Sequence, residues 1–308
     1  MRHLFIVNPA AGKKDFTEKV QEHCRTAFAN APDRFEIYRT RAPKDAITKV
    51  KAECSMAQKT GEELRIYACG GDGTLNECVN GAANMPLCAV THFPTGTGND
   101  FLRTFGEEKE LFRDLSNLTF GEVRPLDLIE CNGRYSIAVC SVGLDARIGT
   151  RVHKYTKAPF IGNKAGYVIS LGANFIEGIT DDMKISVNDY KIEGNVNLAC
   201  VCNGTSYGGG FTPVPEARPD DGILDVLVAH NVTRPKLLGV VLDYAKGQYA
   251  KHPDYIHHER TDKVVIDCPY ELDINLDGEL MKDKHVEMKL CKGAVNFIFP
   301  RGMKYFKD

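Results

Sequence analysis

A glycine-rich turn between an apolar segment and a helix start constrains this chain more than any other feature. Residues 64–69 have the length and apolar composition of a buried strand, and three of the next four residues, 70–73, are glycine. Thr74 and Glu77 follow at the spacing of a capping box, which predicts a helix with Thr74 as its N-cap. The stretch therefore predicts a strand, a glycine turn and a helix, whose unpaired first amides suit a phosphate group.

Asp72 lies inside this turn, where a carboxylate would repel phosphate. A metal ion between the two groups removes the repulsion, so the pattern favours a nucleotide bound as its magnesium complex. No Lys follows as in a Walker A loop, and the Gly-Gly-x-Gly spacing differs from the Rossmann fingerprint. A tight turn that merely needs glycine is the alternative interpretation.

Length and composition narrow the protein class. The 308 residues favour two domains over one, and the net charge of −2 gives no basic signature for nucleic acid. The eleven cysteines form no C-x-x-C pair and are expected to be buried and reduced, as in a cytosolic protein. Several of them lie inside apolar runs: Cys69, Cys88, Cys140, Cys200 and Cys202. No apolar run reaches membrane-spanning length, so any membrane contact is expected to be peripheral.

Strands alternate with helices in the first domain, residues 1–125. The expected strands are 4–7, 35–38, 64–69 and 87–93. The expected helices are 15–29, with Phe16, Val20 and Cys24 inward, and 45–59, with Ala46, Val50 and Met56 inward. This alternation predicts an α/β domain, a parallel sheet with helices on both faces, whose ligands bind at the carboxyl ends of the strands. Asn8, Thr40 and the loops 70–74 and 95–100 all follow strands, so four loops should converge there.

Residues 126–292 have a different texture, with short segments separated by turn residues. The expected strands are 126–130, 134–142, 183–187, 191–193, 198–202, 223–229, 264–267, 271–276 and 286–290. This pattern predicts a β-rich antiparallel sandwich or barrel-like domain, interrupted by helical stretches at about 164–177 and 234–249. The tail 293–308 holds one more strand, 295–299, which is expected to return to the first domain.

Two acidic loops repeat the chemistry of the glycine turn. The loop 96–100 carries Thr97, Asn99 and Asp100 at a strand-to-helix junction, and an ordinary helix cap is the alternative. Near the end of the second domain, Asp277 and Glu279 flank a glycine, close to Asp273. Three carboxylates within seven residues suit a general base or a metal site, although Asp-Gly is also a standard hairpin turn.

A third acidic turn follows three glycines at 208–210. Asp220 and Asp221, followed by Gly222, could hold a hard cation through one carboxylate and neighbouring carbonyls. A plain turn into the strand 223–229 is the alternative. The pair Lys13-Lys14 is expected to be solvated, and the pair His257-His258, which has no partner at metal spacing, is expected at the surface.

Four ordered motifs resemble the bacterial diacylglycerol kinase and YegS-type lipid kinase family, which includes sphingosine and ceramide kinases. The motifs are G-G-D-G-T-L-N-E (70–77), G-T-G-N-D-F (96–101), G-G-G with D-D-G-I-L-D-V (220–226), and L-D-G-E (276–279). The resemblance implies a nucleotide domain like that of NAD kinases and phosphofructokinases, joined to a β-rich domain for the lipid substrate. It implies ATP-dependent transfer of the γ-phosphoryl group to a lipid hydroxyl.

The same resemblance assigns roles by motif. The expected nucleotide contacts are Asn8, Thr40, Gly70, Gly71, Asp72, Gly73, Thr74, Leu75, Asn76, Thr97, Asn99 and Asp100. Asp72, Asp100 and Asp127 would form the acidic network around a catalytic Mg²⁺ and its waters, and Asp277 or Glu279 would accept the proton of the attacking hydroxyl. The ligands of a second, structural Mg²⁺ would be the Asp221 carboxylate and the carbonyls of Arg218 and Ile223.

The sequence therefore predicts an ATP- and Mg²⁺-dependent kinase that converts diacylglycerol to phosphatidic acid. It would be cytoplasmic and meet its lipid substrate by peripheral contact at the inner face of the membrane; a homodimer is a further expectation, and nucleic acid is not an expected partner. Phosphatidylglycerol or a sphingoid base is the alternative substrate, and NAD kinase fits the D-G-E motif less well. A nucleotide-binding regulator without turnover is the alternative from another class, against which the intact Asp72 and 277–279 motif argue.

Overall fold

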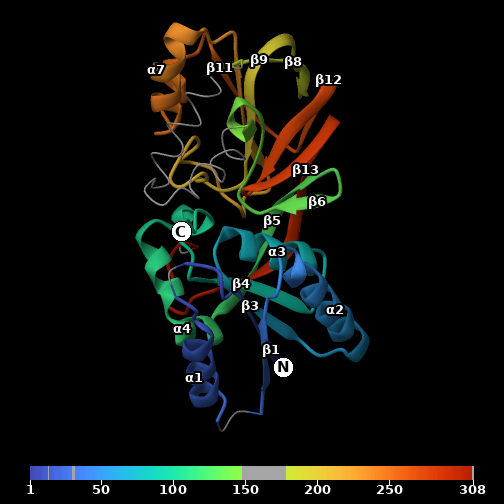
Figure 1. Cartoon of the computed structure of the whole chain (residues 1–308), viewed down its shortest axis with the longest axis vertical. Helices are drawn as coiled ribbons and strands as arrows, with labels where there is room; N and C mark the ends of the chain where they lie inside the picture. Colours follow the sequence, from blue (N-terminus) through green and yellow to red (C-terminus); the bar gives the residue numbers. More distant parts are fainter. Residues whose placement is uncertain (13, 30–31, 148–177, 307–308) are drawn as a thin grey trace. The chain divides into compact units, whose positions relative to one another are not determined.

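The computed structural model describes residues 1–12, 14–29, 32–147 and 178–306 (Figure 1). The chain divides into two compact units, the first formed by 1–128 with 292–308 and the second by 129–291. The helix expected at 164–177 and the side chain of Lys13 lie outside the described residues.

A parallel sheet organises the first unit. Its strands, in order across the sheet, are β2 (Arg34–Arg39), β1 (Arg2–Val7), β3 (Leu64–Gly70), β4 (Cys88–Pro94) and the last part of β13 (Glu279–Phe299). The central strands are almost continuously buried, as the apolar runs of their sequences require when helices cover both faces. The return of the chain's last strand to the first unit, beside β4, is confirmed.

Helices flank this sheet on both sides. They are α1 (Thr17–Ala27), α2 (Asp45–Thr60), α3 (Asp72–Ala82), the 3₁₀ segment η1 (Phe101–Arg113) and α4 (Leu115–Thr119). Figure 1 shows α1 and α4 on one side of the sheet and α2 and α3 on the other, and each pair is in contact. The predicted α/β architecture with helices on both faces is confirmed.

One inward position of α2 was predicted wrongly. The buried stripe of this helix runs through Ala46, Val50, Cys54 and Ala57, whereas Met56 is exposed. Successive helical residues are separated by about 100° around the axis, so Met56 falls outside the stripe that its neighbour Ala57 completes.

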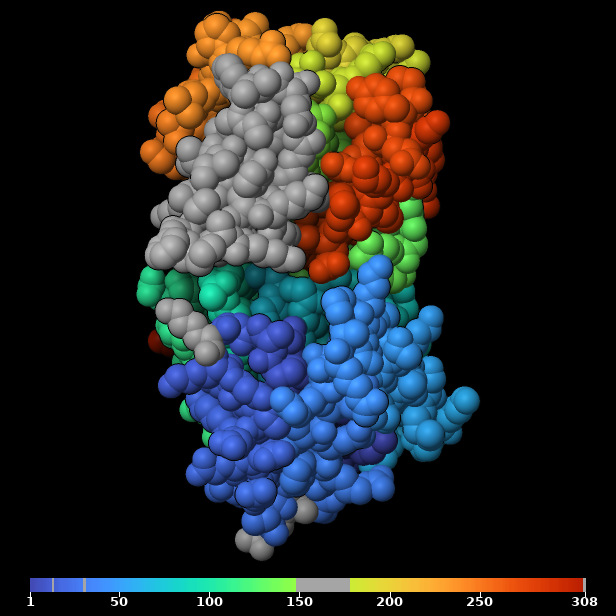
Figure 2. All heavy atoms as spheres, viewed as in Figure 1, coloured from blue at the N-terminus to red at the C-terminus, as the bar shows by residue number. Residues whose placement is uncertain are grey.

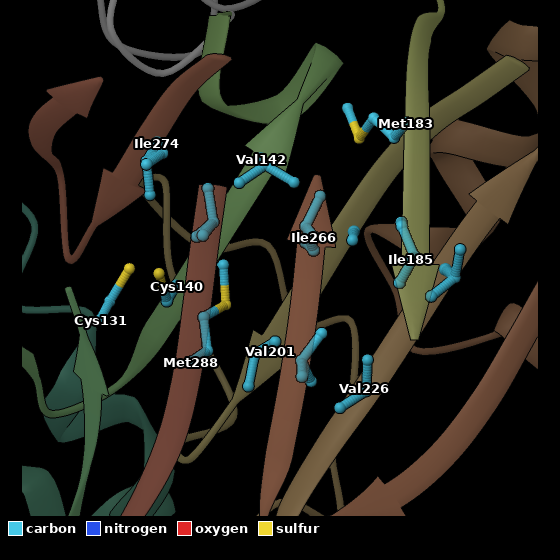
Figure 3. Close-up of a cluster of buried hydrophobic side chains, with 14 of the residues drawn as sticks. Cys131, Cys140, Val142, Met183, Ile185, Val201, Val226, Ile266, Ile274 and Met288 are labelled. Atoms are coloured by element: carbon cyan, nitrogen blue, oxygen red, sulfur yellow. The ribbon is translucent and has the colours of Figure 1, made fainter. Parts of the chain in front are cut away.

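The second unit is antiparallel. Its strands are β6 (Arg134–Ser136), β7 (Val139–Gly143), β8 (Asp181–Val187), β9 (Tyr190–Cys202), β10 (Leu224–His230), β11 (Ile256–Thr261), β12 (Lys263–Leu276), the end of β5 (Glu122–Cys131) and the first part of β13. The long strands β9 and β12 each pair with β8 along one half and with β7 along the other, which closes the sheets around an apolar interior. Figure 3 shows Val142, Ile185, Val201 and Ile266 pointing into this core.

Several strand limits differ from the sequence-based expectation. The segments 191–193 and 198–202 form one strand, β9, and 264–267 joins 271–276 in β12 across a register shift. β11 was not predicted at all, because its polar sequence I-H-H-E-R-T lacks an apolar alternation. The helix α7 (Arg234–Tyr244) ends before the short segment η2 (Tyr249–Lys251), so the expected single helix to residue 249 was too long.

The helix α7 lies at the surface of the second unit, in the orange part of the chain (Figure 2). Leu237 and Val240 are buried, whereas Leu238 and Leu242 are exposed. None of the described helices has the length and apolar character that crossing a bilayer requires.

Candidate active site

Close glycine contacts hold three loops of the first unit together at the carboxyl edge of its sheet. A Cβ atom on Gly96 would lie 2.6 Å from the Gly71 Cα, and one on Gly12 would lie 2.1 Å from the Thr95 carbonyl oxygen. Real Cβ atoms essentially never come so close, so only glycine permits these approaches. The predicted convergence of the loops after β1, β3 and β4 is confirmed.

The Gly70 carbonyl group joins the second and third of these loops. It accepts hydrogen bonds from the backbone amides of Thr95 (2.9 Å) and Gly96 (3.1 Å), and from Nε2 of His92 (3.1 Å). Asn8, after β1, adds a link to the first loop because its Nδ2 donates to the Thr74 hydroxyl at 3.1 Å. The backbone around the glycine turn is therefore fixed from both neighbouring strands.

His92 is fully buried in β4, directly beneath this turn. A carbonyl oxygen only accepts, so the contact with Gly70 requires a proton on Nε2. Burial lowers the pKa of His92 to about 4, and the backbone hydrogen bond opposes this shift. The imidazole is therefore neutral near pH 7, and it acts as a donor that positions the glycine turn.

The helix start differs from the predicted capping box. α3 begins at Asp72, and the extended residue Gly71 is its N-cap, so Thr74 already lies inside the helix. The Glu77 carboxylate instead accepts from the backbone amides of Lys44 (2.8 Å) and Ala46 (3.1 Å), at the start of α2. The prediction was wrong because Glu77 caps a neighbouring helix, and the local spacing carried no information about that partner.

Two of the expected metal ligands lie near one glycine. A Cβ atom on Gly98 would be 2.8 Å from Oδ2 of Asp72 and 4.0 Å from Oδ2 of Asp100. Oδ1 of Asp72 accepts from the Phe101 amide at 3.4 Å, and Oδ1 of Asp100 pairs with Nε of Arg103 at 3.0 Å. Each carboxylate thus has one oxygen in contact with a residue of η1 and its other oxygen close to Gly98.

Asn99 adds an acceptor to the same loop. Its backbone has a φ of 52°, and its Nδ2 donates to the Gly96 carbonyl at 2.8 Å. Its Oδ1 is buried and has no hydrogen-bond partner within the described part of the chain. A buried amide oxygen without a partner costs free energy, which a bound cation or a donor on a ligand would recover.

The remaining expected nucleotide contacts are less uniform. Thr97 is exposed on the loop, whereas Leu75 and Asn76 are buried inside α3. Thr40 donates its amide to the Val7 carbonyl at 2.9 Å. With Pro9 it borders a cavity of about 430 Å³, whose other lining residues are Ile37, Tyr38, Arg39 and Arg41.

Asp127, the third acid of the expected magnesium network, is buried in β5. Its Oδ1 accepts from the Gly293 amide of β13 at 2.8 Å. In the ranges that the structure describes, no three acidic, histidine or cysteine side chains are grouped as a metal centre. The geometry therefore brings Asp72 and Asp100 toward one loop, and gives Asp127 a link between two strands.

The two acids of the Asp277-Gly278-Glu279 motif have different surroundings. Oδ1 of Asp277 accepts from the Ser136 hydroxyl (2.7 Å) and from the amides of Ala138 and Val139 (both 3.0 Å). Its Oδ2 accepts from the Ile137 amide at 2.8 Å. Asp277 thus holds the turn between β6 and β7 with both oxygens.

Glu279 is half-buried at the start of β13, and among the described residues its carboxylate has no hydrogen-bond or ion-pair partner. Asp273, the third acid of this group, pairs with Nζ of Lys282 at 3.2 Å. Among the described residues, therefore, none takes up the lone pairs of the Glu279 carboxylate.

The acidic turn at 220–222 does not match the expected structural magnesium site. Oδ2 of Asp221 bonds the Arg260 guanidinium, and its Oδ1 faces the Ile223 amide at 3.3 Å. The Arg218 guanidinium bonds both oxygens of Asp220, at 3.1 and 3.2 Å. Burial raises the pKa of Asp221, and Arg260 opposes that shift. Of the expected ligand set, the Asp221 carboxylate is therefore already contacted by a guanidinium and a backbone amide of this chain.

Sequence reasoning missed two residues of these sites. His92 was part of an apolar strand, and only its position before the loop 95–100 could have marked it. Arg260 lies in the unpredicted strand β11, where it shares one face of the strand with His258, two residues earlier.

Comparisons with known proteins identify the family domains of this chain. Residues 2–131 match the diacylglycerol kinase catalytic domain, and residues 138–299 match the YegS C-terminal NAD kinase beta sandwich-like domain. A diacylglycerol kinase of Staphylococcus carnosus is 28% identical over 306 residues, covering 96% of this chain and 97% of that protein. A protein of Shewanella frigidimarina named "Probable lipid kinase YegS-like" is 28% identical over 244 residues, covering 77% and 76%.

A crystal structure of a diacylglycerol kinase from Bacillus anthracis str. Sterne superposes with a TM-score of 0.70 at 22% identity, covering 98% of both chains. This likeness supports the fold of an α/β domain followed by a β-sandwich. Because the two family domains together match most of its length, the chain belongs to the diacylglycerol kinase and YegS-type lipid kinase family.

Replacing His92 with Gln should flatten the pH dependence of stability. The folded-state pKa of about 4 lies below the ordinary value of 6.5, so the unfolded chain binds more protons in between. Stability is therefore lost as the pH falls from about 6.5 towards 4, by up to about 3 kcal/mol for this residue. Gln keeps a donor for Gly70 but does not titrate. Urea unfolding at a series of pH values would measure the slope, and an unchanged slope would contradict the assignment.

Proposed function

We propose that this protein transfers the γ-phosphoryl group of ATP to a lipid hydroxyl, with diacylglycerol as substrate and phosphatidic acid as product. The proposal rests on one observation. Three loops pack closely through glycine residues at the carboxyl edge of the first sheet, and Asp72 and Asp100 lie beside them. The names of the relatives support a lipid kinase, and those that are called diacylglycerol kinase favour this substrate.

The nucleotide fits this edge for two reasons. The turn 70–73 precedes the first amides of α3, and a helix N-terminus favours phosphate oxygens. The cavity beside Thr40 has room for the remainder of the nucleotide, and it is bordered by Arg39 and Arg41. Phosphoryl transfer needs little covalent work from the protein, so holding the phosphates in place is the main requirement.

A magnesium ion would suit the acids at this edge. Oδ2 of Asp72, Oδ2 of Asp100 and the unpartnered Oδ1 of Asn99 are hard oxygen donors around the loop 96–100. When bound, the ion would neutralise charge on the phosphates, and these residues would hold it together with solvent molecules. Arg103, which pairs with Asp100, keeps that carboxylate oriented.

Glu279 is the better candidate for the base that accepts the proton of the lipid hydroxyl. Asp277 already accepts four hydrogen bonds, which fix its position, whereas no described residue donates to the Glu279 carboxylate. Asp277 would therefore shape the turn from which Glu279 projects.

The substrate also suggests where the protein works. Diacylglycerol resides in a bilayer, so the proposed kinase would act from the cytoplasm by peripheral contact with the inner face of the membrane.

The Asp72→Asn variant should lose kinase activity while it keeps the stability of the fold. Purified protein would be incubated with labelled ATP, Mg²⁺ and mixed micelles that contain diacylglycerol, phosphatidylglycerol or a sphingoid base. We expect labelled phosphatidic acid with wild type and a loss of at least about 100-fold in the variant, with its melting temperature nearly unchanged.

The other outcomes of this assay are equally informative. If only another lipid becomes labelled, that lipid is the substrate. If ATP binds but no lipid becomes labelled, the result would favour a nucleotide-binding regulator without turnover. Full activity of Asp72→Asn would contradict the metal assignment.

Matched variants of the Asp-Gly-Glu motif should divide its two roles. Glu279→Gln should lower kcat by about 10²–10⁴-fold with little change in melting temperature, because it removes only the proton acceptor. Asp277→Asn replaces one accepting oxygen with an amide donor, which would face at least one of the backbone donors, so we expect its melting temperature to fall by about 2–6 °C. Thermal unfolding and steady-state kinetics would be measured together, and the reverse pattern would make Asp277 the base.

A further inference from the structure

A positively charged side chain of the protein, that of Arg260, contacts the acidic turn 220–222. Arg260 belongs to β11, directly opposite Asp225 of β10 in the antiparallel pairing. Its guanidinium bonds Oδ2 of Asp221, and its Nε lies 3.5 Å from Oδ1 of Asp225. One planar side chain thus connects the turn to the strand that follows it.

The position of Asp225 explains why a positive charge is required here. Its side chain is only 3% exposed, and a buried carboxylate is costly unless it is paired. Nε2 of His258, two residues before Arg260 on the same strand face, contacts Oδ1 of Asp225 at 2.8 Å. Arg260 supplies a charge that does not depend on pH, because a guanidinium stays protonated in proteins.

The other acid of the turn is also neutralised from within the chain. Asp220 is paired with Arg218 through both carboxylate oxygens. Three carboxylates in six residues, 220–225, therefore face two guanidinium groups and one imidazole. A divalent cation at Asp221 would stand against the Arg260 guanidinium, and the two positive charges would repel each other.

We propose that Arg260 takes the place of a structural divalent cation at this turn, so that the second unit is stable without a metal. The guanidinium fork holds Asp221 and Asp225 in the arrangement that a bound ion would otherwise impose. The inference concerns the folding of the second unit and does not depend on the proposed kinase activity. Any divalent-cation requirement of the reaction would then arise at the nucleotide site alone.

Thermal unfolding of the full chain without nucleotide tests this proposal. The melting temperature would be measured in EDTA and in millimolar MgCl₂, for wild type, Asp221→Asn and Arg260→Leu. We expect the same wild-type value in both buffers, within about 1 °C, and a fall of about 2–4 °C in Arg260→Leu. Lys184→Leu is the matched control, since its exposed pair with Glu193 should be worth little.

Three results would overturn the proposal. The first is a wild-type melting temperature that falls on chelation and no longer does so in Asp221→Asn. The second is an unchanged melting temperature in Arg260→Leu, and the third is an equal fall in Lys184→Leu. If Arg260→Leu does not fold, Arg260→Lys keeps the charge without the fork, and a smaller but measurable fall supports the same conclusion.

Discussion

The approach of one glycine backbone to another underlies the candidate active site. Gly96 and Gly71 come from loops after adjacent parallel strands, and a Cβ atom on Gly96 would lie 2.6 Å from the Gly71 Cα, so the loops could not keep this approach with a side chain at position 96. The Gly70 carbonyl then ties both loops through three donors, one of them the buried His92. Because this backbone is fixed in advance, the amides and carboxylates at the sheet edge need little reorganisation to receive phosphate.

Acidic residues of the same apparent character have different physical roles. Asp277 and Asp221 satisfy backbone amides and a guanidinium, and so they hold turns. Asp72 keeps one oxygen beside the loop 96–100, and the Glu279 carboxylate has no partner among the described residues. The acidic residues of these motifs thus fall into two groups: carboxylates that stabilise the fold and carboxylates that can bind a ligand.

The sequence predicts those features that local spacing determines. The apolar strands of the first unit, the helices between them and the convergence of loops at their carboxyl ends all follow from composition and period. Contacts between residues that are far apart in the sequence cannot be predicted in this way. Glu77 accepts from the Ala46 amide 31 residues earlier, Asp277 bonds residues about 140 positions away, and Arg260 contacts Asp221 across 39 residues. The motif spacing locates such residues but leaves their partners open.

The affinity for Mg·ATP of a Gly96→Ala variant tests the central claim most directly. Its Cβ atom would fall 2.6 Å from the Gly71 Cα and force the two loops apart, whereas Gly239→Ala in α7 meets nothing within 4 Å. By isothermal titration calorimetry, we expect Gly96→Ala to weaken binding at least about tenfold, or 1.4 kcal/mol, and Gly239→Ala to bind like wild type. Wild-type affinity in Gly96→Ala would contradict a nucleotide site built on these glycine loops.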